Sequence, residues 1–229
     1  MADDVKLRLI EIAGEAFATR GFDAVGIREI CQKAGANVAA VNYHFGDKRA
    51  LYVACLRHAQ SCRVDELAAP QWPADMPPTE KFHAFVRGML ESKLDSRRPI
   101  WHLELMLREL SRPSDACREI VEDYIRPMAE ALAEILRELM PGSDWSKQTW
   151  LIGFSIVGQV LFYYINQPIV RLLMGEADYH TLSLDDLAEH ITQFSLAAIG
   201  KAAPVEIDAA PAHLPSTSSA TVARSRGNQ

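Results

Sequence analysis

The feature that most constrains this chain is residues 27–52, IREICQKAGANVAAVNYHFGDKRALY, where two short helical patterns flank a tight turn. Gly35 stands where a helix ends in a left-handed residue, and Asn37 is a favourable N-cap for the helix that follows. In that second helix Val41 and Phe45 are four residues apart, so they share one inward face. The segment therefore predicts a helix-turn-helix.

The outer face of the second helix combines small side chains with hydrogen-bonding ones. Small residues let a helix approach a surface closely, and asparagine, tyrosine and histidine supply donors and acceptors on it. Asp47 is placed to cap the next helix, so that Lys48 and the first free N–H groups of that helix project beside the second helix. Turn, cap and polar face agree with entry into a DNA groove.

Together with an amphipathic helix predicted at residues 5–20, this stretch resembles the DNA-binding domain of TetR-type transcriptional regulators. The turn glycine, the cap, the Tyr-His-Phe run and the capped lysine recur at the family's spacing, and the resemblance covers residues 1–60. It implies one group of residues at the base edges and a second group at the phosphates. The base-edge group is Val38, Ala39, Ala40 and Asn42, and the phosphate group is Tyr43, His44 and Lys48.

Arg28 and Asn37 complete the predicted DNA-binding set. Arg28 is expected at a phosphate or in the groove, with a surface ion pair as the alternative. Two positions depart from the family, which usually has Ser or Thr in place of Gly26 and frequently Lys or Arg in place of Val38. Gly26 is the weaker cap by a few tenths of a kcal/mol, and Val38 lacks the cationic group that would contact guanine.

A second resemblance covers residues 98–121, RPIWHLELMLRELSRPSDACREIV, which are similar to the ligand-binding domain of the CecR-like branch of the same family. It implies an apolar pocket with a few polar edges. Taken singly, each candidate residue is better explained as part of the core, and only the whole set together with the resemblance indicates a pocket. The predicted lining residues are Met89, Trp101, His102, Leu105, Met106, Tyr124, Phe162 and Tyr163.

The rest of the chain reads as all-α, since no stretch has a convincing two-residue alternation. We expect a three-helix DNA-binding domain at residues 1–48, a larger ligand-binding and dimerisation domain of about nine helices at 49–200, and a disordered tail at 201–229. Pro127 predicts a kink in the helix that contains it. Expected body helices are 47–68, 79–94, 100–110, 114–140, 145–166 and 184–200, with a proline-rich linker at 70–78.

The predicted homodimer interface comes from the last two long helices. The helix at 145–166 is apolar nearly all round, so it has more apolar surface than one monomer's core requires. Burial at the centre of the monomer is the alternative. The candidate contact residues are Trp150, Phe154, Val157, Leu161, Leu187, Ile191 and Phe194.

Charge and cysteine usage limit the class of protein. Residues 1–60 carry 8 Lys/Arg and 7 Asp/Glu, whereas residues 61–229 carry 16 and 23, so the acidic excess lies outside the predicted DNA-binding domain. A local cluster of cations suffices for phosphate binding. The 4 cysteines form no CxxC pair, no signal peptide is recognisable, and no apolar run reaches the ~18 residues of a membrane span. We expect a soluble cytoplasmic protein without a membrane partner.

Catalytic and metal-binding motifs are missing from the sequence. His58 and Cys62 have helical i, i+4 spacing but lack a third and fourth ligand, and Glu104 with Arg108 reads as an ion pair. We therefore expect no enzyme activity, no metal and no cofactor. The expected function is a homodimeric, ligand-responsive repressor that binds a palindromic double-stranded operator and a small apolar effector. A helical ligand carrier or protein-interaction module that has lost DNA binding is the alternative.

Overall fold

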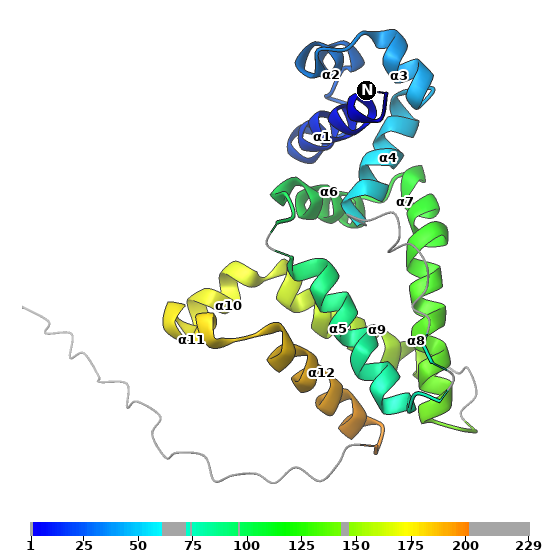
Figure 1. Ribbon diagram of the computed structural model, residues 1–229, viewed down its shortest axis with the longest axis vertical. Helices are drawn as coiled ribbons and strands as arrows, with labels where there is room; N and C mark the ends of the chain where they lie inside the picture. The colour runs from blue at the N-terminus through cyan, green and yellow to red at the C-terminus, as the bar shows by residue number, and fades with distance from the viewer. Residues whose placement is uncertain (1, 61–71, 74, 96, 143–146, 202–229) are drawn as a thin grey trace, which may run out of the picture.

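A computed structural model of the chain describes residues 2–60, 72–73, 75–95, 97–142 and 147–201, and these residues are helical with connecting turns and no strand. Figure 1 shows an elongated molecule in which the first four helices form a head at one end. The predicted linker lies mostly outside the described residues, and the predicted tail does so apart from residue 201. The all-α prediction is confirmed.

Four helices precede nine further helical elements in the described residues, and one of those nine is a π-helical turn. The head begins with α1 (Ala2–Arg20), α2 (Ile27–Ala34), α3 (Val38–His44) and α4 (Lys48–Gln60). The body continues with α5 (Pro78–Leu94), α6 (Ile100–Ser111), α7 (Asp115–Ile120), the π-helical turn η2 (Val121–Ile125) and α8 (Arg126–Leu139). It ends with α9 (Lys147–Ile165), α10 (Gln167–Met174), α11 (Glu176–Thr181) and α12 (Leu184–Ala198).

Two clusters of buried apolar side chains organise these helices. The first core joins α1 to α4 with α6 and α7, and it includes the fully buried Leu9, Phe17, Leu51 and Leu105. The second core joins α5, α8, α9 and α12 around residues such as Ile191. Because α6 belongs to the first core, the head is packed on part of the body, and its contacts extend beyond residue 48.

Close packing fixes α6 against α1. The indole of Trp101 lies so near Gly14 that a Cβ atom built there would be 2.3 Å from a ring carbon. The indole Nε1 donates to Glu11 at 3.3 Å. Farther along α6, Arg108 donates to the carbonyl oxygens of Ala18 and Thr19, both at 3.1 Å. These carbonyls belong to the last turn of α1 and have no acceptor role within the helix. Arg108, about 90 residues later in the sequence, therefore caps the end of α1. The predicted ion pair between Glu104 and Arg108 is not formed.

A buried polar network crosses the first core. The Tyr52 hydroxyl donates to Glu109 Oε2 at 2.7 Å, and Glu109 Oε1 accepts from the backbone N–H and the hydroxyl of Ser114, both at 2.8 Å. Glu109 is 2% exposed, so these donors replace the water that its carboxylate loses. Burial and the neighbouring Glu109 raise the pKa of Tyr52, which keeps the hydroxyl protonated as a donor. The network holds α4, α6 and the start of α7 together.

The long predicted helix at 114–140 is divided where a kink was expected. Ser114 caps α7, accepting from the Ala116 N–H at 3.1 Å. The backbone then changes to the π-helical turn η2 immediately before α8, whose second residue is Pro127. Proline supplies no N–H and its ring crowds the preceding turn, so a wider turn before it relieves that conflict.

Helix α9 is unusual because it is apolar yet poorly covered. By length and composition its 19 residues could cross a membrane, although only 17% of its most apolar 18-residue stretch is buried. A single such helix is weak evidence for a membrane span, because some helices of soluble proteins have the same length and composition. Trp150, Leu151, Phe154 and Phe162 are all exposed on it, at 45%, 54%, 63% and 49%. The helix therefore exposes several large apolar side chains.

Candidate nucleic-acid interface and effector cavity

The turn between α2 and α3 is held by backbone geometry that its residues favour. Gly35 adopts φ +60°, the left-handed region that glycine enters without a steric penalty, and the Ala36 N–H donates to the Cys31 carbonyl at 2.9 Å. Asn37 then caps α3, its Oδ1 accepting from the Ala40 N–H at 2.8 Å. The two helices are thus fixed at both ends of the turn.

Helix α3 presents its inner and outer faces as the sequence predicts. Val41 is fully buried and Phe45 packs partly against the first core. On the outer face Tyr43 is 83% exposed and Val38 is 40% exposed. In Figure 1, α2 and α3 lie at the far end of the head, away from α5 to α12. A groove of DNA could therefore reach α3 without meeting the body.

The nine predicted DNA-binding residues lie on α2, α3 and the adjoining helix ends, but they differ in exposure. The exposed ones are Arg28, Asn37, Val38, Ala39, Asn42 and Tyr43. The partly buried ones are Ala40, His44 and Lys48. Ala40 packs against the first core, so it offers less surface to a base edge than its neighbours.

The alternative for Arg28, a surface ion pair, is not formed with any described residue. Its neighbour Glu29 instead binds Arg20 at 2.6 Å and Lys33 at 3.3 Å. The hydrogen bond from Arg20 is the main reason that the pKa of Glu29 is lowered. The Arg28 guanidinium is therefore left available for a phosphate.

Lys48 stands at the start of α4, beside the end of α3. Asp47 caps α4 by accepting from the Ala50 N–H at 2.7 Å. The Lys48 ammonium lies 4.4 Å from the centre of the Phe22 ring, a cation–π contact that orients the side chain without neutralising it. The helix N-terminus and this ammonium together form a positive region next to α3.

Helix α4 also carries the ion pairs that join the head to α7 and η2. Arg49 binds Glu119 at 2.7 Å, while Arg57 binds Asp123 and lies 3.7 Å from Glu119. These cations are committed to the body, so the positive charge available for DNA is concentrated nearer α3.

The eight residues predicted to line one pocket are not brought together. Trp101, His102, Leu105 and Met106 are buried where α6 packs on the head, and Tyr124 packs against the same first core. His102 is 1% exposed, and burial together with nearby His58 and Arg98 lowers its pKa to about 4. Met89 packs on the second core. The alternative of core packing is correct for these residues; Phe162 and Tyr163, by contrast, line a cavity.

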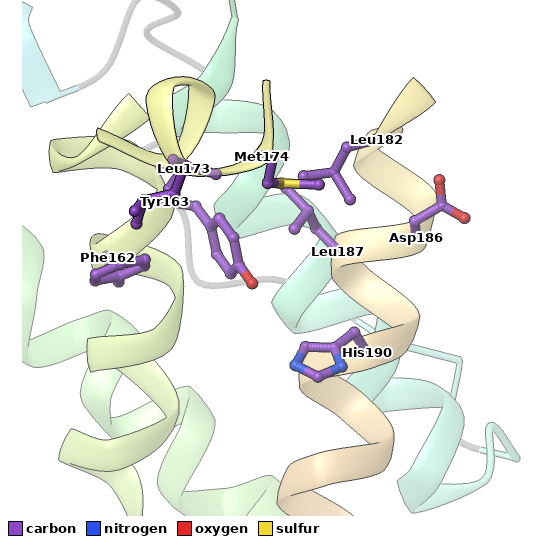
Figure 2. Close-up of a pocket in the computed structure, with 9 residues that line it drawn as sticks. Phe162, Tyr163, Leu173, Met174, Leu182, Asp186, Leu187 and His190 are labelled. Carbon is purple, nitrogen blue, oxygen red and sulfur yellow. The ribbon is translucent and has the colours of Figure 1, made fainter. Parts of the chain in front are cut away.

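That cavity lies between α9, α10 and the start of α12 and has a volume of about 440 Å³. Figure 2 shows Phe162 and Tyr163 on one side and Leu187 and His190 on the other. Sequence reasoning missed the lining residues of α10 because that helix was not expected, and it assigned Leu187 of the expected last helix to the dimer interface. The apolar positions in QPIVRLLM are the signal that could have found α10.

The seven candidate dimer residues also divide. Leu187 and Ile191 are 6% and 0% exposed inside the second core, so the structure contradicts their placement at a subunit contact. Val157 and Leu161 are partly buried. Trp150, Phe154 and Phe194 are exposed, the last at 60%. Within the described part of the chain α9 and α12 are neighbours, linked by a hydrogen bond from Gln159 Nε2 to Ser195 Oγ at 3.3 Å.

No group of three or more potential metal ligands occurs among the described residues. His58 binds Glu11 at 3.1 Å and stacks on Trp101, while Cys62 lies outside the described residues. Burial raises the pKa of the Cys31 and Cys55 thiols, which makes them poor thiolate ligands.

Comparison with family models gives two matches that together cover most of the helical part. Residues 9–55 match the bacterial regulatory proteins of the tetR family. Residues 78–199, more than half of the chain, match the C-terminal domain of the HTH-type transcriptional dual regulator CecR.

Individual relatives agree with these models. The HTH-type transcriptional dual regulator CecR of Shigella flexneri is 26% identical over 187 residues, which are 76% of this chain and 81% of that protein. The crystal structure of HlyIIR, a hemolysin II transcriptional regulator, matches with a TM-score of 0.57 at 20% identity. The match covers 84% of this chain and 97% of the HlyIIR chain. The crystal structure of a TetR-like transcriptional regulator from a Rhodococcus species matches with a TM-score of 0.59 at 16% identity. That match covers 86% of this chain and 96% of the Rhodococcus chain. At these identities the two structures show a shared fold.

Proposed function

Because this chain belongs to the TetR family of bacterial transcriptional regulators, with a C-terminal domain of the CecR type, we propose that it is a homodimeric repressor that leaves a palindromic operator when a small apolar effector binds. The chain is a DNA-binding transcriptional regulator and not an enzyme. Regulators of this family are soluble DNA-binding proteins, and we place this one in the cytoplasm. A module without DNA binding finds no support in the matched models, both of which describe transcriptional regulators.

The outer face of α3 is the observation that carries the DNA-binding part of the proposal. Asn42 is exposed on it and has the geometry to pair with adenine, while Val38 and Ala39 offer apolar surface to thymine methyl groups. Tyr43, Lys48 and, from α2, Arg28 would contact phosphates. Only a few side chains of one α3 would therefore read the bases. Two copies of the protein, each reading one half-site, would double the number of base contacts.

The exposed apolar surface of α9 and α12 supports the homodimer. A single head buries too little surface to hold one site tightly, and a palindromic operator needs a two-fold partner. We call the set Trp150, Leu151, Phe154, Phe162 and Phe194 the α9–α12 face. A second copy would cover this face and place two copies of α3 about one helical turn of DNA apart, ~34 Å.

Regulation would work through the position of the heads. An effector can shift the protein only towards a state that it binds more tightly. In the proposal, that state has a head spacing that no longer fits two half-sites. Helix α4 is the coupling element, because it packs in the first core and its Arg49 and Arg57 bind α7 and η2.

The direct test is binding of the purified protein to its own promoter region in a mobility-shift assay at two salt concentrations with excess nonspecific DNA. We expect a discrete complex that weakens as salt rises. Lys48→Ala should reduce the slope of log affinity against log salt by about one unit, and Tyr43→Ala should weaken binding to all sequences. Asn42→Ala should lower the preference for the operator over random DNA by about ten- to a hundredfold.

Lys147→Ala is the matched control, because Lys147 is an exposed lysine at the start of α9, far from α3 along the chain. Its salt slope should equal that of the unmodified protein. If Lys48→Ala and Tyr43→Ala bind like this control, the assignment of α3 and its flanks as the DNA interface is wrong.

A further inference from the structure

The cavity between α9, α10 and α12 contains polar groups that the protein itself does not use. Tyr163 reaches it from α9, and His190 reaches it from α12. Within the described residues, neither the phenol oxygen nor the imidazole nitrogens have a hydrogen-bond partner; their contacts are with the rings of Phe162 and Phe194. Tyr163 is half-buried and His190 is exposed, so two polar groups from different helices border one open cavity without a hydrogen bond between them.

Apart from Asp186, the rest of the wall is apolar. Val170 and Leu187 are each 6% exposed and form buried parts of the lining, while Phe162 and Leu173 stand at the outside, 49% and 79% exposed. A volume of about 440 Å³ is in the range of small-molecule sites, which combine apolar walls with a few convergent polar groups.

The surrounding charge decides against an anion. Residues 167–198 contain one Arg and five Asp or Glu. That Arg, Arg171, lies 3.8 Å from Glu176 and stacks over Tyr179, so it is not directed at the cavity. An anionic ligand would meet a negative field with no cation to pair with it.

The cavity is also unfavourable for a cation. Asp186 is the carboxylate nearest to the cavity, but its Oδ2 accepts from the N–H of Ser183 at 2.9 Å and from its hydroxyl at 2.6 Å, in the cap of α12. In Figure 2 this carboxylate points away from Tyr163. A cation in the cavity would lose water without gaining a counter-ion.

We infer that this cavity is the effector site and that it takes an uncharged, mainly apolar molecule carrying one hydrogen-bonding group, which Tyr163 and His190 bind together. The inference rests on the proposed response to an effector and names the site and the chemical class of that effector. It keeps Phe162 and Tyr163 from the predicted lining and excludes the region of Trp101 and His102.

Two probes with one ring skeleton test the charge class. N-phenyl-1-naphthylamine is uncharged and has one N–H group, whereas 8-anilinonaphthalene-1-sulfonate adds a sulfonate to the same rings. Titrated into the full-length protein and followed by calorimetry, the amine should bind with one molecule per chain. The sulfonate should bind more weakly by about tenfold or more, because its charge is not compensated. Equal affinities would overturn the inference.

Two neighbouring leucines of α10 locate the site. Leu173 lines the cavity and Leu172 does not, yet both are exposed, at 79% and 80%, so tryptophan at either position should leave the fold intact. Leu173→Trp should fill the cavity and weaken binding of the amine by about tenfold or more, and Leu172→Trp should change it by less than about twofold. Tyr163→Phe, which removes one hydrogen bond, should cost about three- to tenfold. If both tryptophan variants bind alike, the site lies elsewhere.

The site and the proposed function can fail separately. Loss of probe binding in Leu173→Trp together with unchanged promoter binding of the unmodified protein in the presence of the amine would keep the site and reject its coupling to DNA. Promoter binding with equal probe affinity in both tryptophan variants would keep the regulator and reject the site.

Discussion

The two cores of this protein are completed in different ways. The first core is closed by specific polar contacts between segments far apart in sequence, such as Tyr52 with Glu109 and Arg108 with the end of α1. The second core leaves apolar side chains such as Phe154 and Phe194 in solvent. Directional bonds fix one arrangement of the head on α6 and α7, whereas an uncovered apolar surface is stabilised by association. We therefore propose that a rigid DNA-binding unit is joined to a unit that associates with a second copy.

The largest expected effect is on the α9–α12 face. Phe154→Asp places a charge on this face, so the dimer dissociation constant should rise by about a hundredfold or more, ~2.7 kcal/mol, because the carboxylate would be buried without a partner. Analytical ultracentrifugation measures this constant. Leu7→Asp on α1, where Leu7 is 48% exposed, is the control and should not affect association. Equal effects of the two changes would mean that the second core does not associate through this face.

The next effect compares helical glycines in the two regions. Gly14→Ala forces a Cβ against the Trp101 indole in the first core and should lower the free energy of unfolding by about 2 kcal/mol, measured by urea denaturation. Gly88→Ala in α5, where nothing lies within 4 Å of the added Cβ, should raise it by about 1 kcal/mol through helix propensity alone. Trp101→Phe added to Gly14→Ala should recover part of the loss. Stabilisation by Gly14→Ala would show that the indole is not held tightly.

A smaller effect tests the polar link across the first core. Tyr52→Phe removes the hydroxyl that donates to Glu109 and should lower the free energy of unfolding by about 1.5 to 2 kcal/mol, since the acceptor is charged and buried. Tyr43→Phe, at an 83% exposed position, is the matched control and should leave stability unchanged. Thermal and urea unfolding both measure the difference in stability between the two variants. Identical unfolding curves would show that the network does not stabilise the first core.

The smallest effect concerns the cap of α2. Gly26 has extended backbone angles, φ −95° and ψ 140°, no side-chain cap, and open space where a Cβ would stand. Gly26→Ser should therefore stabilise the head by a few tenths of a kcal/mol. Gly35→Ser, at φ +60°, should instead destabilise it by about 1 kcal/mol. A loss of stability in Gly26→Ser would contradict the geometry of this cap.

Local signals in consecutive residues were sufficient for much of the head. The left-handed Gly35, the Asn37 cap and the Asp47 cap are each satisfied by groups within four residues, so a short sequence contains the whole interaction. The same holds for the Ser114 cap. The pocket prediction failed for the opposite reason. An apolar helix face indicates that its residues are buried, but it does not identify the helix against which they pack. Trp101 meets α1, about 90 positions away.

By itself, the sequence determined the all-α class, the helix-turn-helix and the outer face of α3, because helix periodicity and caps act over a single turn. Only the tertiary structure decided that α6 completes the core of the head, that Leu187 and Ile191 are buried within one monomer, and that Tyr163 and His190 meet at one cavity. These outcomes depend on how distant apolar surfaces pack together. Such packing is collective, so it is fixed by the shape of the assembled helices and not by any one of them.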